Sequence, residues 1–211
     1  MTIRRPIRPM GPVAALVECA PGEPGPLVLA ARRMGVGIGS AGVVEMVPAA
    51  CTVLVECVDA ESLDRTVDLV RSIEIGRPGS DELEAVEIPV CFDGADLDEV
   101  AARCARSVDE VIGTVVAGPL RVAFCGFAPG FAYLDGLPSW LHLPRRDTPR
   151  ARVPEGSFAV AAGYAAVYPS ASPGGWNLLG STSAEIWSID RNPPAVLAPG
   201  TPVRIIAVDR T

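Results

Sequence analysis

The first third of the chain alternates between the two hydrophobic periods that distinguish strands from helices. Apolar and β-branched residues predict a strand within residues 13–19 and two more within residues 43–57. Residues 26–34 have the apolar spacing of a short helix, and a second helix is predicted over residues 62–73, with Ser62 as its N-cap. The order strand, helix, two strands, helix is typical of a ferredoxin-like α+β unit.

A turn-rich polar stretch at residues 76–81 interrupts this pattern. Stretches of this kind commonly join domains, because few contacts cross them. We therefore predict a ferredoxin-like N-terminal domain over residues 1–80 and a second domain over residues 81–211.

The second domain opens with alternating apolar residues at 84–92, which predict a strand. Two short helices are predicted at 96–106 and 107–116, the latter with Ser107 as N-cap and Glu110 completing a capping box. Beyond residue 121 the helical period is lost. Short apolar runs between glycines and prolines then predict strands at 122–124, 157–161, 165–168, 183–189 and 203–208. This pattern predicts a β-barrel or a sandwich.

Composition narrows the classes of function. The net charge of −7 disfavours nucleic acid, because binding a phosphate backbone needs a basic surface. All 18 basic residues are arginines, so no lysine is present to form a Schiff base or to grip phosphates in a P-loop. The 21 glycines and 21 prolines favour turns and short strands over a helical bundle.

The cysteines and the single histidine give few candidates for chemistry. No two of the six cysteines have Cys-x-x-Cys spacing, so we expect reduced thiols in a cytoplasmic protein, with Cys125 as a possible reactive thiol. No signal peptide or membrane-spanning run is apparent, so no membrane contact is expected. His142 is alone, which excludes a multi-histidine metal site, and we expect no metal. It is a packed or surface residue or, alternatively, a catalytic one.

The densest local signal combines glycines and aromatic residues over residues 124–137. Gly126 and Gly130 allow close backbone approach, while Phe127, Phe131 and Tyr133 form an aromatic wall on which a flat ring can lie. Alternatively, these aromatic residues fill the core and the glycines only turn the chain.

Two further segments offer groups for an anion. Four arginines occur within residues 145–152, and arginines bind carboxylates and phosphates through two parallel hydrogen bonds. The turn at residues 173–176 presents backbone amides beside Trp176, and such amides can hold negative charge. The alternatives are a solvated loop whose arginines pair with Asp147 and Glu155, and a purely structural turn.

Taken together, these segments resemble the family of 5-oxoprolinase B subunits, also named allophanate hydrolase subunit 1 and Kip-type kinase A inhibitor. The segments agree with that family in order and spacing over residues 85–182. The matching stretches are 86–90, 126–134, 144–145, 148–150, 153–154, 168–169 and 172–176.

The resemblance implies a ferredoxin-like N-terminal domain and a cyclophilin-like, carboxyltransferase-type β-barrel, α+β overall. It also implies partner subunits C and A, with which the chain would act as an ATP-dependent hydrolase that converts 5-oxo-L-proline to L-glutamate. ATP, with Mg²⁺, would be used by the complex, and its site can lie on a partner subunit. Two alternatives stay open: a non-catalytic inhibitor of a sporulation-type histidine kinase, and a component of a biotin-dependent, urea-type carboxyltransferase.

We expect a binding site for a small anionic substrate and assign no catalytic residue. Arg145 and Arg150 are expected to hold the anion, and the glycine amides of the turn to stabilise negative charge. Two departures from the family, at Tyr164-Ala165 and Ser181, remove polar groups that relatives often carry. The expected binding residues are Gly126, Phe127, Pro129, Gly130, Phe131, Tyr133, Arg145, Arg150, Pro173, Gly174, Gly175 and Trp176.

Overall fold

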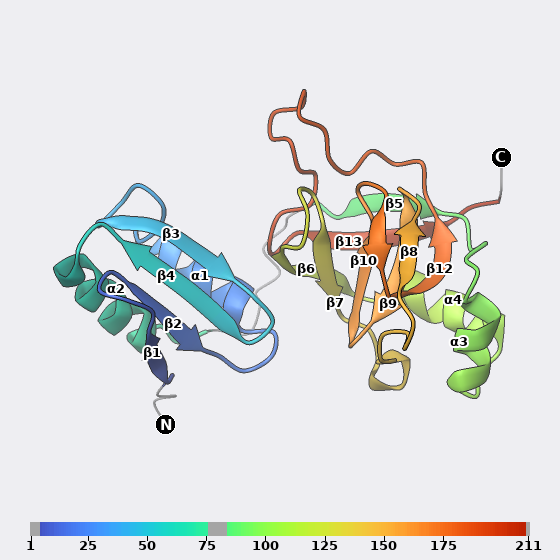
Figure 1. Ribbon diagram of the computed structural model, residues 1–211, viewed down its shortest axis with the longest axis horizontal. Helices are drawn as coiled ribbons and strands as arrows, with labels where there is room; N and C mark the ends of the chain where they lie inside the picture. Colours follow the sequence, from blue (N-terminus) through green and yellow to red (C-terminus); the bar gives the residue numbers. More distant parts are fainter. Residues whose placement is uncertain (1–4, 76–83, 210–211) are drawn as a thin grey trace. The chain divides into compact units, whose positions relative to one another are not determined.

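The computed structural model describes residues 5–75 and 84–209. The chain divides into two compact units, Met1–Glu82 and Leu83–Thr211 (Figure 1). No hydrophobic cluster of the described residues is shared between the units. The boundary predicted between residues 80 and 81, and the turn-rich stretch at 76–81, lie outside the described residues.

The described part of the first unit is an antiparallel sheet of four strands with two helices, and its strand order is β1-β2-β4-β3. The predicted order of strand, helix, two strands and helix is confirmed, and the short β1, which pairs with β2, was not predicted. Alternate strand residues such as Val17 and Val55 are buried with Leu27 and Val67 from the helices. The elements are β1 (Ile7–Pro9), β2 (Ala14–Glu18), α1 (Pro24–Arg33), β3 (Val43–Pro48), β4 (Thr52–Cys57) and α2 (Ala60–Ser72).

The predicted N-cap of the second helix is wrong. Helix α2 begins one residue after Asp59, which has extended backbone angles and accepts a hydrogen bond of 2.7 Å from the Ser62 amide. Ser62 is buried within the first turn. The apolar pattern predicted a start that is too late in the sequence. Its first apolar residue, Leu63, is the fourth residue of the helix, and the residues before it are already helical.

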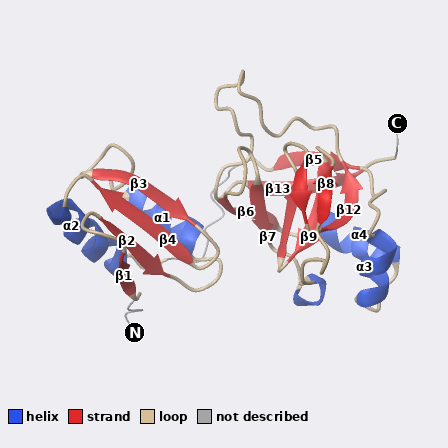
Figure 2. Ribbon diagram, viewed as in Figure 1, coloured by secondary structure: helices blue, strands red, loops and turns tan. Residues whose placement is uncertain are grey.

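Residues 84–209 form a seven-stranded sheet in the order β12-β9-β10-β7-β6-β13-β5. Its two ends meet at a bridge in which Cys91 and Ser181 exchange hydrogen bonds of 2.8 Å, so the sheet is a nearly closed barrel (Figure 2). Strands β8 and β11 pair separately. The elements are β5 (Val86–Val90), α3 (Leu97–Arg103), α4 (Val108–Ala117), β6 (Leu120–Cys125), β7 (Ala132–Asp135), a 3-10 turn (Ser139–Leu141), β8 (Arg150–Val153), β9 (Ser157–Ala161), β10 (Tyr164–Val167), β11 (Ser172–Gly174), β12 (Asn177–Ser181) and β13 (Pro202–Ala207).

Strand β9 is buried along its whole length because both faces of the sheet carry apolar clusters. Phe158 and Val160 belong to the main core, whereas the alternate residues Ala159 and Ala161 belong to a second cluster that contains Phe131. The aromatic residues therefore gather on the face of the sheet opposite the main core.

The strand predicted at 183–189 is wrong. Within these described residues, only Trp187 makes a β-bridge, to Ala195. Pro193 and Pro194 precede the partner residue and have no N–H to donate, so a ladder cannot extend there. The chain forms a long loop instead, drawn above the barrel in Figure 2.

Gly94 provides a test of how closely the α3 segment packs on β12. Its amide donates to Leu179 O at 3.1 Å, and an added Cβ would overlap the backbone of Leu178 and Leu179. We expect Gly94→Ala to lower the free energy of unfolding by about 1–3 kcal/mol, measured by urea denaturation. The matched control is Gly113→Ala, where nothing lies within 4 Å of the added Cβ in helix α4. That change should raise stability by about 0.5–1 kcal/mol, and equal effects at both sites would contradict the packing.

Candidate functional site

A cavity of about 250 Å³ lies on the aromatic face of the barrel unit. It is lined by eight of the predicted residues, Phe127, Phe131, Tyr133, Arg145, Pro173, Gly174, Gly175 and Trp176. The lining also includes Arg146, Pro149 and Tyr168, which sequence reasoning missed. Four predicted residues do not line it: Gly126, Pro129, Gly130 and Arg150. Three segments separated in sequence thus form one pocket.

Phe131 is the centre of the aromatic wall. Its ring, 1% exposed, contacts Tyr133, Tyr168 and Trp176 edge to face, with centroids 5.1, 5.3 and 5.6 Å away. Each such pair contributes about 0.5–1.5 kcal/mol beyond the area that it buries. The rings pack against one another as core residues do, and they also line the cavity. That a flat ring lies on this wall stays a prediction.

Phe127 and Gly130 have different roles in the loop between β6 and β7. Phe127 is 64% exposed and has a positive φ of 74°, which costs a non-glycine residue about 1–3 kcal/mol. Its ring extends the wall outward from Phe131, at 5.2 Å. Gly130 serves packing instead, because a Cβ there would overlap the Trp187 side chain.

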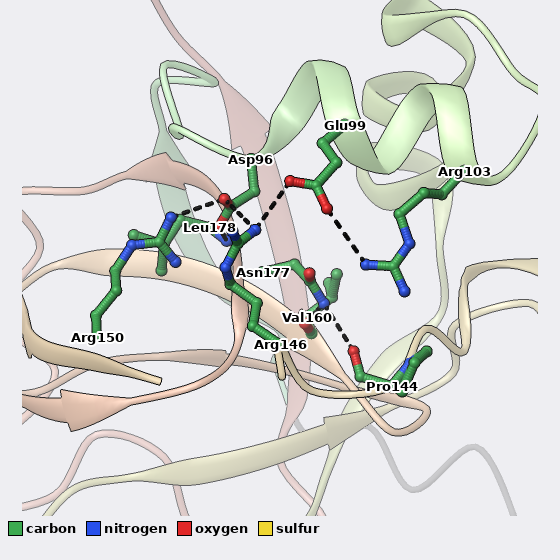
Figure 3. A network of polar contacts seen from close by, with 9 residues as sticks. All are labelled: Asp96, Glu99, Arg103, Pro144, Arg146, Arg150, Val160, Asn177 and Leu178. Carbon is green, nitrogen blue, oxygen red and sulfur yellow. Dashed lines mark hydrogen bonds and ion pairs between the residues drawn. The ribbon is translucent and has the colours of Figure 1, made fainter. Parts of the chain in front are cut away.

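Two of the four clustered arginines form ion pairs with acids of the same chain (Figure 3). Arg146 and Arg150 donate to the same oxygen of Asp96, at 2.8 and 2.7 Å, and Arg146 also donates to Glu99 at 2.9 Å. Their partners are thus acids about fifty residues earlier in the chain, not the neighbouring Asp147. Arg150 was expected to hold the anion, but the structure places its guanidinium on Asp96 and outside the pocket lining.

Asp96 is a buried carboxylate, 2% exposed, that sequence reasoning missed. Burial acts to raise its pKa, but hydrogen bonds from Arg150 and from the Leu178 amide outweigh that effect, and the positive charge of Arg146 adds to them. The pKa therefore lies below its ordinary value of 3.8, and Asp96 is ionised at neutral pH. Its only sequence signal was its position at the start of a predicted helix.

Arg145 is the available cation at the pocket. It is exposed, and within residues 5–75 and 84–209 its guanidinium has neither an ion pair nor a hydrogen bond. Burial raises the pKa of Tyr133 and Tyr168, and the charge of Arg145 offsets part of that rise. Both phenols therefore stay protonated at neutral pH and can donate hydrogen bonds. The pocket combines an aromatic wall, phenol donors and one unpaired guanidinium, which suits a small ring that carries a negative charge.

The turn at residues 173–176 and the residue that follows it are fixed by hydrogen bonds to neighbouring segments. The Gly175 carbonyl accepts a hydrogen bond of 2.7 Å from the Arg146 amide. Asn177 is fully buried, and its side-chain amide donates to Pro144 O and Val160 O, both at 3.1 Å. Asn177 therefore supports the pocket from the core and presents no amide to a ligand.

Neither departure from the resembled family lies in the pocket lining. The Tyr164 ring contacts Tyr133 at 5.8 Å from behind, and Ala165 is buried in the main core. Ser181 lies at the end of β12 and donates to Asp93 at 2.8 Å. These three residues therefore pack in or pair with the barrel and do not form the pocket surface.

His142 and Cys125 also lie outside the pocket lining. His142 Nε2 is 2.9 Å from Leu137 O. Burial raises the pKa of the Cys125 thiol, which disfavours the reactive thiolate. Among the described residues, no group of three His, Cys, Asp or Glu side chains is arranged to hold a metal ion. None of the helices in residues 5–75 and 84–209 is long and apolar enough to cross a bilayer.

The sequence and the fold match known proteins. The family model described as carboxyltransferase domain, subdomain C and D, matches residues 6–197. A curated relative from Escherichia coli O157:H7, named as the B subunit of 5-oxoprolinase, is 40% identical over 169 residues, which is 78% of each chain. The solved structure of TTHA0988 has a TM-score of 0.77 and 32% identity over 98% of this chain, which spans 41% of the TTHA0988 chain. The Kluyveromyces lactis urea amidolyase shares the fold, with a TM-score of 0.69 and 19% identity over 97% of this chain and 15% of its own.

The raised pKa of Cys125 predicts slow alkylation. We expect iodoacetamide at pH 8 to modify the exposed Cys51 about tenfold faster than Cys125, because burial raises the pKa of the Cys125 thiol and limits access to its sulfur. Peptide mass spectrometry over time measures both rates in one sample. Equal rates would contradict the burial of Cys125.

Proposed function

Because this chain belongs to the family of carboxyltransferase domains, subdomains C and D, we propose that it is the B subunit of an ATP-dependent 5-oxoprolinase. This complex would open the lactam ring of 5-oxo-L-proline to give L-glutamate. The name of the E. coli relative supports the proposal, and the observation that carries it is the aromatic pocket with its single unpaired guanidinium. We propose a cytoplasmic location. All six cysteines lie in the described ranges and are free thiols, as is usual in a reducing compartment.

The pocket groups correspond to the groups of the proposed substrate. The Arg145 guanidinium would pair with the substrate carboxylate, and the rings of Phe127 and Phe131 would seat the flat lactam. The protonated phenols of Tyr133 and Tyr168 would donate to the lactam oxygen, where negative charge develops. We propose a binding role for each of these residues.

ATP would supply activation of the lactam, whose carbonyl is shielded by amide resonance, by converting its oxygen into a good leaving group. Several cations usually hold a triphosphate, and the pocket offers one unpaired arginine in a cavity of about 250 Å³. We therefore place ATP and Mg²⁺ on a partner subunit. This chain would supply the binding half of the substrate site.

The residues that line the pocket support a reaction that depends on partner subunits. None of its residues, all within the described range 84–209, is an acid, a histidine or a cysteine that could act as a general base or nucleophile. We propose that subunits C and A complete the site. We assign the two units to the ferredoxin-like and cyclophilin-like folds, which the β-α-β-β-α order and the nearly closed barrel support.

A component of a biotin-dependent carboxyltransferase is the second candidate. The family description and the fold shared with urea amidolyase favour it. It requires a biotinylated carrier among the partner proteins, whereas the oxoprolinase does not. The comparisons do not support the histidine-kinase inhibitor.

Reconstitution tests the proposed function. Co-expression with its A and C partner subunits should give glutamate release from 5-oxo-L-proline that requires ATP. The chain alone should release no glutamate, because its pocket lacks a general base. Turnover by the single chain, or biotin-dependent carboxyl transfer by the complex without oxoproline hydrolysis, would contradict the proposal.

Arg145→Ala tests the substrate contact within that complex. Removing the only unpaired guanidinium of the pocket should raise KM for 5-oxo-L-proline about ten- to a hundredfold, the cost of a lost charge-assisted hydrogen bond. Arg152→Ala is the matched control, since Arg152 is exposed in β8 and does not line the pocket. It should leave KM within about twofold of the parent. If both changes raised KM equally, the effect would come from the net positive charge of this region, and a direct contact between Arg145 and the substrate would be contradicted.

A further inference from the structure

Asp96 occupies the N-cap position of α3, but its side chain does not cap that helix. An aspartate at this position normally accepts a hydrogen bond from the first turn, which stabilises the helix by about 1 kcal/mol. Here both carboxylate oxygens point elsewhere: one accepts from Arg146 and Arg150, and the other accepts from the Leu178 amide at 2.7 Å (Figure 3). The usual local interaction has been replaced by three contacts that are distant in sequence.

We propose that Asp96 is a positioning residue that holds two walls of the pocket in register and keeps Arg145 as its only unneutralised charge. This inference rests on the proposed function of the pocket. It assigns a role in substrate binding to a residue that does not itself line the cavity.

The two walls meet at this carboxylate. Arg146 belongs to the wall that carries Arg145, and Leu178 lies two residues after Trp176 of the other wall. The Arg146 amide also donates to Gly175 O at 2.7 Å, so the walls are joined directly as well as through Asp96. A shift of the Asp96 carboxylate would therefore move one wall against the other.

Each arginine in the ion-pair cluster around Asp96 has an acid partner. Arg146 and Arg150 face it directly, and Glu99 faces it through Arg146 and also pairs with Arg103 at 3.6 Å. Arg103, Arg146 and Arg150 thus share two acids, and each of the three has a partner, which leaves Arg145 as the arginine of the pocket without an acid partner among the described residues. A pocket of this charge favours a single carboxylate over a polyphosphate.

Stability alone does not account for this arrangement. Arg150 Nη1 is buried without a hydrogen-bond partner in the described structure, and the N-cap bond of α3 is absent. Both features cost stability, and buried ion pairs are often no more stabilising than apolar residues of the same size. Their presence beside the pocket agrees with a role in geometry.

Hydrogen exchange on the full-length chain tests the positioning without any assay of activity. In Asp96→Asn the Arg146 amide, whose acceptor Gly175 is not altered, should exchange about tenfold faster because the walls separate. The matched control is Val111→Ala, which removes buried apolar volume from α4 in the main core. An Arg146 amide that exchanges no faster in Asp96→Asn than in the control would overturn the inference.

Kinetics of the reconstituted complex test the link to the substrate. Asp96→Asn should raise KM for 5-oxo-L-proline about tenfold and leave kcat within about twofold, because binding geometry changes and no reacting group is lost. Adding Arg150→Gln should recover part of KM by removing the unbalanced charge, whereas Val111→Ala should leave KM unchanged. An unchanged KM in Asp96→Asn would overturn the role in substrate binding. If the parent complex hydrolyses no oxoproline, the proposed function fails, and hydrogen exchange still decides whether Asp96 holds the walls.

Discussion

A carboxylate taken out of water must be surrounded by hydrogen-bond donors, and this requirement organises the pocket unit. Asp96 satisfies it with two guanidinium groups and one backbone amide, drawn from segments fifty or more residues away. The loop that bears the arginines is thereby fixed against the start of β12. Two guanidinium groups and the Leu178 amide are thereby held at one carboxylate beside the cavity, while Arg145 stays without an acid partner in the part of the chain that the structure describes.

The second requirement is a sheet that is apolar on both faces. One face of the barrel sheet carries the main core, and Phe131 belongs to a second cluster on the opposite face. Rings that pack edge to face have few alternative arrangements, so the cavity beside them is preformed. The aromatic rings pack as a core cluster and also line the cavity, so the core interpretation of the motif does not exclude a binding role.

The site is rich in binding groups and poor in reactive ones. Its lining has aromatic rings, phenols and one free guanidinium, while Cys125 and His142 are engaged elsewhere with backbone carbonyls of Leu197 and Leu137. A surface of this kind can hold and orient a small anion, but the chemistry of lactam opening needs further groups. The division of a reaction between subunits agrees with this composition.

Features that depend on near neighbours could be predicted from the chain alone. Apolar periods predicted the elements of the first unit except β1, and the capping box of Ser107 and Glu110 is present as expected, because its partners are three residues apart. The motif segments also named most of the pocket lining. The folded chain was needed to reveal the partners of Arg146 and Arg150, the support by Asn177 and the loss of the strand at 183–189. These features depend on which segments, distant in sequence, come together in the folded chain, and the local pattern of residues does not predict that.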